Sequence, residues 1–349
     1  MRVLVAMSGG VDSSMAAALL VEAGHDVTGV HLKMADTPSG LPGKGCCTLD
    51  DARDARRVAD RLGVPFYVWD LSAPFRERVV DDFVAEYAAG RTPNPCIRCN
   101  ERVKYTALLA RARAVGFDAL ATGHHVRLRR DAAGVAHLWR AADRAKDQTY
   151  VLYMATQDQL RHTCWPVGEY AKADVRAMAA DRGLPVATKP DSTDVCFIPS
   201  GDLGGFLRPR LGTRAGAFVG PDGAVVGAHD GAYRFTVGQR RGLGLNGFTE
   251  PWYVTGIAGD DVRVGPRALL ERDTLTATGC SWVAGTPPTG PVTAQVRYRG
   301  APLPCALTVT AEDCVEIAFS AQRPVGVAPG QAVVVYDGDE CLGGGTIVS

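Results

Sequence analysis

Short apolar runs alternate with amphipathic stretches over the first third of the chain. Four runs of mostly apolar or β-branched residues are typical of buried strands: Val3–Ala6, Val27–Leu32, Phe66–Trp69 and Ala119–Thr122. Between them lie four stretches with helical spacing or helix-forming composition, each followed by a glycine: 13–23, 49–62, 75–89 and 103–115. This order of strands and helices predicts a parallel sheet with helices on both faces.

The pattern changes from about Gly201 onward. Glycine, proline and other turn residues now separate short β-branched runs, which lie at 217–219, 223–226, 252–254, 292–296 and 332–336. Such spacing is typical of small antiparallel β-domains. We therefore expect an α/β fold class: a parallel-sheet domain at 1–203, a small, mostly-β central domain at 204–272 and a C-terminal β-barrel at 273–349.

Charge and hydropathy exclude few functions. The 349 residues contain 38 Lys and Arg and 38 Asp and Glu, so the formal net charge is zero and gives no overall attraction to nucleic acid. Local basic clusters, such as Arg127-Arg129-Arg130, could still contact phosphates. The apolar run after Met1 is too short for a signal peptide, and no segment has the length of a membrane span. We expect a soluble, cytoplasmic protein that does not bind membranes.

The strongest chemical signal is the turn between the first strand and the first helix, Ala6-Met7-Ser8-Gly9-Gly10-Val11-Asp12-Ser13-Ser14. Two glycines let the backbone bring N–H groups close to an anion, and the start of a helix adds positive potential. The turn lacks the lysine of a Walker P-loop. Asp12 in its place suits a magnesium ion bound to pyrophosphate.

Three of the ten cysteines lie in polar segments where thiols can react. Cys96 and Cys99 follow two prolines, and we expect them just before a helix, flanked by Arg98 and Arg102. Cys196 lies in a polar loop after Asp191. From these residues alone, half of a zinc site, a redox pair or a structural thiol are open alternatives. No role follows for Cys46-Cys47.

The turn Ser8-Gly9-Gly10-Val11-Asp12-Ser13 resembles the SGGxDS loop of the PP-loop ATP pyrophosphatases, which cleave ATP to AMP and pyrophosphate. Thr92-Pro93-Asn94-Pro95-Cys96-Ile97-Arg98-Cys99-Asn100 and Asp191-Ser192-Thr193-Asp194-Val195-Cys196-Phe197-Ile198 further resemble two motifs of the tRNA-specific 2-thiouridylases. The resemblance extends over essentially the whole chain, and the motifs are specific in combination. Many members of that family have aspartate where this chain has Cys96.

The resemblance implies a sulfurtransferase that uses ATP and Mg²⁺ to thiolate the wobble uridine of tRNA at C2. It implies that Cys196 carries a persulfide from a cysteine desulfurase or a sulfur carrier, and that Cys99 is the nucleophile or forms a disulfide on sulfide release. The ATP-binding residues it implies are Ala6, Met7, Ser8, Gly9, Gly10, Val11, Asp12, Ser13, Met34 and Gly123. The tRNA-contacting residues it implies are Asn94, Pro95, Cys96, His124, Lys146, Asp147, Gln148, Arg297, Tyr298 and Gln331.

Three alternatives stay open at this point. Cys96, Cys99 and Cys196 could instead ligate a 4Fe–4S cluster with one open iron. The chain could be another PP-loop synthetase, which would not need these thiols. It could also be a non-catalytic carrier of sulfur or metal, which would not need the turn Ala6–Ser14, called the phosphate loop below. We expect a monomer.

Overall fold

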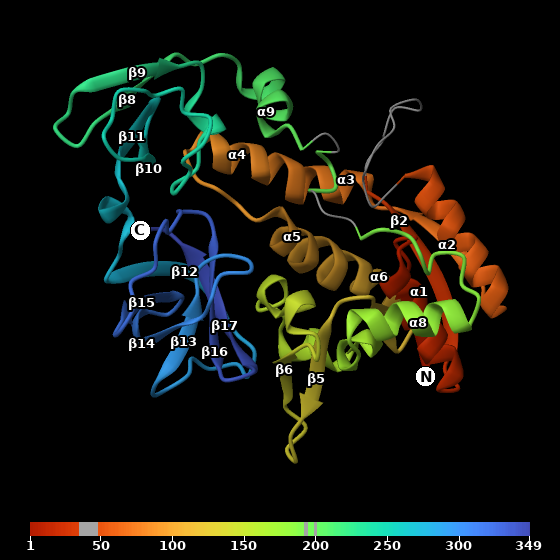
Figure 1. Ribbon diagram of the computed structural model, residues 1–349. Coiled ribbons are helices and arrows are strands. Elements are labelled where there is room, and N and C mark those ends of the chain that lie inside the picture. Colours follow the sequence, from red (N-terminus) through yellow and green to blue (C-terminus); the bar gives the residue numbers. More distant parts are fainter. Residues whose placement is uncertain (35–47, 192–194, 199–200) are drawn as a thin grey trace.

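The computed structural model describes residues 1–34, 48–191, 195–198 and 201–349. Cys46, Cys47 and residues 192–194 therefore lie outside the described residues. The chain forms three parts: an α/β part, a small four-stranded sheet and a C-terminal barrel (Figure 1). None of the helices in the described part has the length and apolarity that a membrane span requires.

The first sheet is parallel, with the order β3-β2-β1-β4-β7. Its strands are β1 (Arg2–Ala6), β2 (Asp26–Lys33), β3 (Phe66–Asp70), β4 (Ala119–Thr122) and β7 (Thr163–Cys164). Alternate residues of β1 enter two different cores: Val3 and Val5 pack on one face of the sheet and Leu4 on the other. The predicted parallel sheet with helices on both faces is confirmed.

One face of the sheet carries α1 (Val11–Glu22), α2 (Leu49–Leu62) and α8 (Lys172–Asp181). The other carries α3 (Ser72–Phe75), α5 (Pro95–Arg98) and α6 (Leu109–Ala114). The helix α4 (Asp82–Ala88) follows on this side, and its Phe83 and Tyr87 pack with Leu207 and Tyr233 near the central sheet. Two π-helical stretches, η1 (Arg76–Asp81) and η2 (Cys99–Leu108), join these into two longer helical runs. Short helical turns complete this part: η3 (Arg144–Lys146), η4 (Thr149–Val151), α7 (Gln157–Arg161) and η5 (Pro166–Glu169).

The central part is a four-stranded sheet of order β10-β11-β8-β9. It contains β8 (Gly216–Val219), β9 (Val225–His229), β10 (Trp252–Ala258) and β11 (Asp261–Pro266), with the turns η6 (Ala232–Arg234) and η7 (Arg267–Leu270). The helix α9 (Leu203–Leu211) precedes it, although this segment contains two glycines and a proline. Asp202 accounts for the helix start, because its carboxylate accepts a hydrogen bond from the Gly205 N–H.

Six antiparallel strands close into the C-terminal barrel, since β12 pairs with both β15 and β17. The strands are β12 (Thr274–Trp282), β13 (Val292–Gln295), β14 (Leu303–Ala311), β15 (Cys314–Phe319), β16 (Ala332–Asp337) and β17 (Glu340–Ile347). Along β16, Val333 and Val335 fill the barrel, whereas Val334 and Tyr336 pack into the core of the α/β part.

A hairpin that we did not predict extends the barrel sheet. It consists of β5 (Val126–Arg130) and β6 (Ala136–Arg140), and β6 pairs with the start of β17. Its first strand carries three arginines and has no buried-strand pattern, so no local signal marked this hairpin. The hairpin joins the α/β part to the barrel by main-chain hydrogen bonds.

Candidate active site

The phosphate loop lies where the chain order of the parallel sheet changes direction. β2 and β3 lie on one side of β1 and β4 on the other, and ligands of open α/β sheets bind at such a point. Gly10 is the N-cap of α1 and has no side chain to cap it, so the first N–H groups of the helix are left for another acceptor. The Ser13 hydroxyl is used inside the loop, because it lies 3.1 Å from the Ser8 nitrogen and 3.2 Å from the Gly10 oxygen.

Two glycines allow the loop to pack closely against its surroundings. Gly9 has a φ of +78°, and a Cβ there would lie 2.3 Å from the carbonyl oxygen of Asp51. A Cβ at Gly123 would lie 2.4 Å from the Ser13 nitrogen. The loop is therefore held between the start of α2 and the segment after β4. This brings Gly123 against the loop to which the resemblance assigned it.

The Asp12 carboxylate is engaged by two basic side chains. Lys172 Nζ lies 2.6 and 2.7 Å from its two oxygens, and His125 Nε2 lies 3.1 Å from Oδ1. Burial opposes ionisation of Asp12, but the hydrogen bonds from His125 and Lys172 outweigh burial and lower its pKa. A carboxylate so placed is charged at neutral pH.

The candidate metal ligands among the described residues do not form a metal site made by protein side chains alone. Among the described residues, no group of three or more His, Cys, Asp or Glu side chains is placed to hold a metal ion. Asp12 is one carboxylate, which suits a magnesium ion that arrives with phosphate oxygens but not one held by the protein alone. Among the described residues, Cys96, Cys99 and Cys196 are not grouped closely enough to ligate an iron–sulfur cluster together.

Both cysteines of the Thr92–Cys99 segment lie inside a helical run, which corrects the expectation that they precede it. Asn94 is the N-cap of α5, and its Oδ1 accepts a hydrogen bond from the Cys96 N–H at 3.0 Å. Pro95 follows at the first helical position, where it favours a helix start. The helix thus begins at Pro95, eight residues before the predicted start at Val103. Cys96 is exposed in the first turn, and Cys99 is buried in the next.

The Cys99 thiol lies against the end of β2. Its Sγ is 4.0 Å from Sδ of Met34, the residue that the resemblance placed near adenine. Cys196 is half-buried and packs against the same hydrophobic core as Cys99 and Met34. The next residue, Phe197, anchors this segment through edge contacts with the rings of Phe75 and Phe83. No disulfide joins any of the cysteines that the structure describes.

The two arginines beside the thiols are turned toward carboxylates. Arg98 pairs with Asp82 and Glu101, and Arg102 pairs with the same two residues, at distances of 2.8 to 3.6 Å. Their charges are therefore balanced locally.

The segment Lys146-Asp147-Gln148 connects several parts of the site. Lys146 Nζ lies 2.8 Å from Asp191, and Gln148 Oε1 accepts a hydrogen bond from the His125 N–H at 2.8 Å. Asp147 pairs with the buried Arg140 at 2.9 Å. All three side chains, which were predicted to contact tRNA, bond to protein groups here.

His124 lies inside the molecule. Its Nδ1 is 2.6 Å from the Thr122 hydroxyl and 3.1 Å from the Tyr105 hydroxyl. Burial, followed by electrostatic interactions with Lys104 and His125, lowers the pKa of His124 well below its usual value, so the ring is neutral. Its predicted contact with tRNA stays a prediction, and the residue is positioned to support Tyr105 and Thr122.

The barrel approaches the thiol segment, Thr92–Cys99, at two places. Arg297 and Tyr298 are exposed on a turn, and the Tyr298 ring lies 5.8 Å from that of Tyr150. Burial raises the pKa of the Tyr298 hydroxyl, and the nearby Cys96 and Asp147 act in the same direction. Gln331 Nε2 donates to the Thr92 carbonyl at 2.7 Å and so holds the thiol segment in this structure. Its predicted contact with tRNA stays a prediction.

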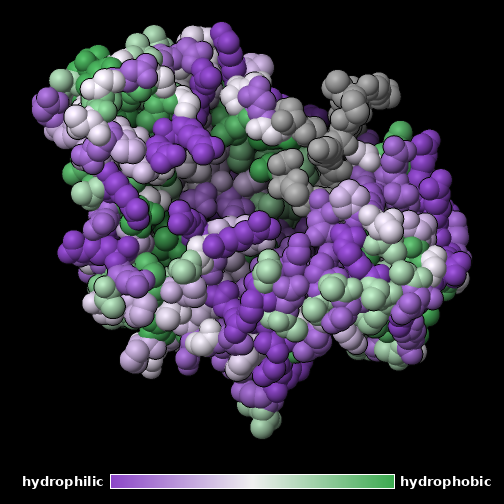
Figure 2. Space-filling model, in the orientation of Figure 1, coloured by the Kyte–Doolittle hydropathy of each residue, from purple (hydrophilic) through white to green (hydrophobic). Residues whose placement is uncertain are grey.

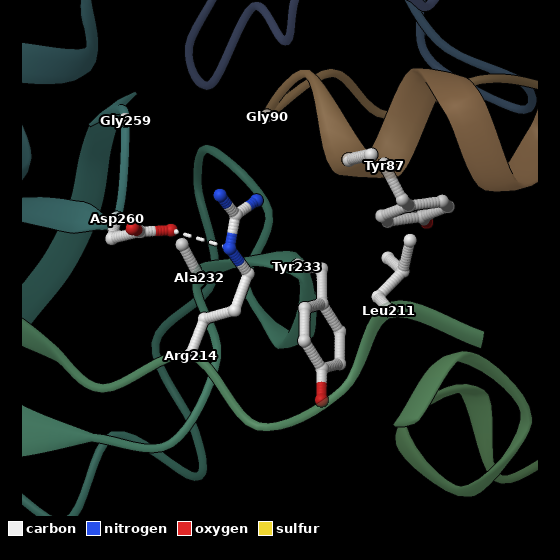
Figure 3. A pocket seen from close by; sticks show the side chains of 9 residues that line it. Tyr87, Gly90, Leu211, Arg214, Ala232, Tyr233, Gly259 and Asp260 are labelled. Atoms are coloured by element: carbon white, nitrogen blue, oxygen red, sulfur yellow. Dashed lines mark ion pairs between the residues drawn. The ribbon is translucent and has the colours of Figure 1, made fainter. Parts of the chain in front are cut away.

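A small pocket lies elsewhere, between the end of α4, the end of α9 and the central sheet (Figure 3). Tyr87 and Tyr233 form part of its wall, and Arg214 and Asp260 form an ion pair beside it. None of the predicted site residues lines it. The face in Figure 2 is largely hydrophilic and is hollowed near its middle, where hydrophobic side chains show between the parts of the molecule.

The sequence analysis did not single out three residues that contact the site. His125 and Lys172 bond to Asp12, and Asp191 bonds to Lys172. His125 is adjacent to a residue that was singled out, so a strand followed by two histidines was a usable signal. Lys172 lies 160 residues from Asp12 in the chain, and no local pattern marks it. Only the packing of α8 beside α1 brings it to the loop.

Three family models match the chain: the tRNA methyl transferase HUP domain at residues 1–200, the tRNA methyl transferase PRC-barrel domain at 204–264 and the aminomethyltransferase beta-barrel domain at 272–347. The first alone matches more than half of the chain. These descriptions speak of methyl transfer, whereas the relatives described next, which match over nearly the full length, are named for thiolation.

Three such relatives are each named tRNA-specific 2-thiouridylase MnmA. The protein of Thermobifida fusca is 52% identical, covering 99% of this chain and 95% of its own length. That of Acidothermus cellulolyticus is 53% identical, with 99% and 97% covered, and that of Mycolicibacterium smegmatis is 51% identical, with 99% of each covered. A solved 4-thiouridine synthetase bound to RNA and ATP matches with a TM-score of 0.35 and 17% identity over 60% of this chain and 50% of that one, a likeness too low to bear on the site.

Proposed function

The chain belongs to the family of tRNA-specific 2-thiouridylases, and we propose that it replaces the C2 oxygen of the wobble uridine of tRNA with sulfur, at the expense of ATP. One observation carries this proposal beyond family membership. The Cys99 thiol is in contact with Met34, at the end of the strand beside the phosphate loop, and Cys196 packs on the same core. A nucleotide on the loop and a sulfur nucleophile would therefore share one site.

The proposed reaction has two steps. The uridine C2 oxygen first attacks the α-phosphorus of ATP, a new O–P bond forms, and pyrophosphate leaves with the electron pair of the broken bond. The N–H groups at the start of α1 would stabilise the charge on the departing group. Mg²⁺, when bound with ATP, would neutralise phosphate charge, and Asp12 is the carboxylate that the chain offers it.

Sulfur transfer follows in the proposal. Cys196 carries a persulfide supplied by a cysteine desulfurase or a sulfur carrier. The terminal sulfur attacks C2, the bond from C2 to the adenylated oxygen breaks, and AMP leaves. Cys99 then attacks Sγ of Cys196, and the bond between Sγ and the transferred sulfur breaks. The 2-thiouridine is released, and the Cys99–Cys196 disulfide that remains is reduced by an external thiol. Thiolates are suited to such attack at neutral pH.

The arrangement of the thiols favours this mechanism over an iron–sulfur cluster. Cys99 and Cys196 share a core, whereas Cys96 is exposed beside Tyr298 of the barrel. Iron and sulfide analysis after anaerobic purification would test the cluster directly. A stoichiometric cluster that is required for thiolation would reject the persulfide route while leaving tRNA thiolation intact.

The proposed function is tested with the purified chain, an unmodified tRNA transcript, ATP, Mg²⁺ and a desulfurase with cysteine. Thiouridine is followed by retardation in a mercury-containing gel, and pyrophosphate release is followed separately. We expect Cys196→Ser and Cys99→Ser each to lower thiouridine formation by at least about 100-fold. Cys196→Ser should still release pyrophosphate, because adenylation precedes sulfur transfer.

Cys164→Ser is the matched control, since this half-buried thiol lies on β7 and packs in the core on the opposite face of the sheet. Thiouridine formation at the wild-type rate by Cys196→Ser would rule out the persulfide role. No tRNA-dependent pyrophosphate release by the wild-type chain would favour a non-catalytic carrier. Turnover of ATP with a small substrate, unaffected by loss of both thiols, would favour another PP-loop synthetase.

A further inference from the structure

Cys96 and Cys99 occupy two successive turns at the start of one helical run. Cys96 is the second residue of α5, and Cys99 is the residue at which α5 passes into η2. Residues three apart on a helix are neighbours, with Cβ atoms about 5–6 Å apart, whereas a disulfide holds its Cβ atoms about 4 Å apart. A shift of about 1–2 Å in the first turn would therefore let the two sulfurs bond.

The first turn is the part of this run where such a shift disturbs few hydrogen bonds. The Cys96 N–H donates to Oδ1 of Asn94 at 3.0 Å, so it takes no part in the main-chain bonds of the helix. Pro95 has no N–H to lose. The Cys99 N–H faces two acceptors, the carbonyls of Pro95 and Cys96, and can keep one of them while the other moves.

The thiols of the proposed site differ in their access to solvent. Cys96 is exposed, whereas Cys99 is only 7% exposed and contacts Met34. Cys196 is half-buried on the same core, next to the anchored Phe197. The disulfide that sulfur transfer leaves between Cys99 and Cys196 would thus lie largely inside the molecule. Exchange requires a thiolate to approach the disulfide in line, so a protein reductant has poor access to it there.

We propose that Cys96 is the resolving thiol of the catalytic cycle, which converts the Cys99–Cys196 disulfide into a Cys96–Cys99 disulfide. This inference rests on the proposed function and adds the step that returns the enzyme to its starting state. It belongs to this chain in particular, because a relative with aspartate in place of Cys96 has no thiol there.

The step is a thiol–disulfide exchange with no net change in oxidation state. The thiolate of Cys96 attacks Sγ of Cys99, a bond forms between these two sulfurs, and the bond from Cys99 to Cys196 breaks. Its electron pair leaves on Cys196, which becomes a thiolate ready to accept the next persulfide. A protein dithiol then attacks the exposed sulfur of Cys96. That dithiol ends as a disulfide, and both Cys96 and Cys99 end as thiols.

Such a relay demands less of the structure than a metal cluster does. The thiols meet two at a time, first Cys99 with Cys196 and then Cys96 with Cys99, so no group of three is required. The effective concentration of a neighbouring thiol also exceeds that of a reductant in solution, which favours the internal attack. The rival route is direct attack of the reductant on Cys196, for which Cys96 would be dispensable.

The first test maps the disulfide after a single turnover of the full chain. The chain is loaded with persulfide by a desulfurase, which is then removed, and receives tRNA and ATP without reductant. Free thiols are blocked with an alkylating reagent, and unreduced peptides are analysed by mass spectrometry. We expect wild type to contain a Cys96–Cys99 disulfide and alkylated Cys196. Cys96→Ser should contain a Cys99–Cys196 disulfide instead.

The second test measures repeated turnover at a limiting concentration of a protein dithiol. The rate of later turnovers divided by the rate of the first should fall at least about 10-fold in Cys96→Ser. This ratio cancels an effect of the substitution on tRNA binding, because such an effect changes both rates. A small phosphine, which has better access to a half-buried disulfide, should restore the ratio. Cys96→Asp should behave as Cys96→Ser does, and Cys164→Ser as wild type does.

A Cys99–Cys196 disulfide in wild type after one turnover, with Cys96 alkylated, would overturn the proposal. So would an unchanged ratio in Cys96→Ser and Cys96→Asp, because the reductant would then reach the disulfide directly. Thiouridine formation by wild type without a disulfide among these three cysteines would overturn it as well, while leaving tRNA thiolation in place. Absence of thiouridine from the wild-type reaction would instead reject the proposed function, and this step with it.

Discussion

The phosphate loop is packed by segments of its own α/β part, whereas the thiol segment, Thr92–Cys99, is held from all three parts of the chain. The loop touches the start of α2 at Asp51 and the residue after β4 at Gly123. In contrast, Thr92 receives the Gln331 amide and lies 3.3 Å from the Thr236 hydroxyl, one from the barrel and one from the segment beside the central sheet. The Thr92 N–H also donates to the Pro329 carbonyl at 2.8 Å.

This difference separates two kinds of dependence. Nucleotide binding by the loop should need the α/β part and its internal packing. The position of the thiols should also depend on where the barrel and the central part lie. Substitutions at the two places are therefore expected to affect different steps of the reaction.

Gly9→Ala should give the largest effect, because it combines strain with a clash. A Cβ at Gly9 would lie 2.3 Å from the Asp51 carbonyl oxygen, at a φ of +78°. We expect a loss of roughly 2–4 kcal/mol in the free energy of unfolding and a fall of at least about 100-fold in kcat/KM for ATP. Chemical denaturation and pyrophosphate release measure the two effects.

Gly24→Ala is the control for strain without a clash. Gly24 has a φ of +77°, but nothing lies within 4 Å of a Cβ there, so a cost of only about 1 kcal/mol is expected. If the two variants were equally stable and equally active, close packing of the loop against α2 would not matter for its function.

The same contrast explains which parts of the site could be predicted from the sequence. The strand, loop and helix around Gly9 are contiguous, so glycine positions and strand length were enough to locate them. The start of α5 also has a local signal, since Asn94 is favoured at an N-cap and Pro95 at the first helical position. The helix was nevertheless predicted to start eight residues too late, at Val103.

Contacts between distant segments left no local pattern. Lys172 and Gln331 act through pairs separated by 160 and 239 residues. The hairpin β5–β6 has three arginines in its first strand, and its pairing with β17 stabilises it. α9 contains Gly204, Gly205 and Pro209, so helix propensity argued against it, and its Asp202 cap and its packing prevail.

Gln331→Leu tests whether the barrel positions the thiol segment. It removes the hydrogen bond to the Thr92 carbonyl and should let the thiol segment shift, so we expect kcat for thiolation to fall about 10-fold. The dissociation constant of tRNA should change by less than about 3-fold. Filter binding and thiouridine formation at saturating tRNA measure these quantities.

Gln322→Leu, at an exposed glutamine of the barrel, is the control. The two roles of Gln331 predict opposite results. A weakened tRNA affinity with a normal rate at saturating tRNA would mean that Gln331 contacts tRNA, as the sequence resemblance implied, and does not position the thiols.

The smallest expected effect is a pH dependence where the hairpin joins the barrel. His137 Nδ1 lies 2.6 Å from Glu340 of β17, and Nε2 lies 3.5 Å from Asp131. Burial works against protonation of His137, but the hydrogen bonds and charges of Glu340 and Asp131 outweigh it and raise its pKa. The folded chain therefore binds this proton more tightly than the unfolded chain does.

The sign of the effect follows from this difference. The stabilisation is fully present below the ordinary histidine pKa of about 6.5 and is lost as pH rises through the raised pKa of the folded state. It should be under about 1 kcal/mol, because the pair is partly exposed. We expect the melting temperature of wild type to exceed that of Glu340→Gln at pH 5.5 by at most a few degrees, and the difference between the two to narrow by pH 8.5.

Glu316→Gln, at an exposed barrel glutamate, should show no such pH-dependent difference from wild type. A gap that is constant with pH would mean that His137 does not titrate against Glu340, and that main-chain pairing of β6 with β17 holds this junction without the charge.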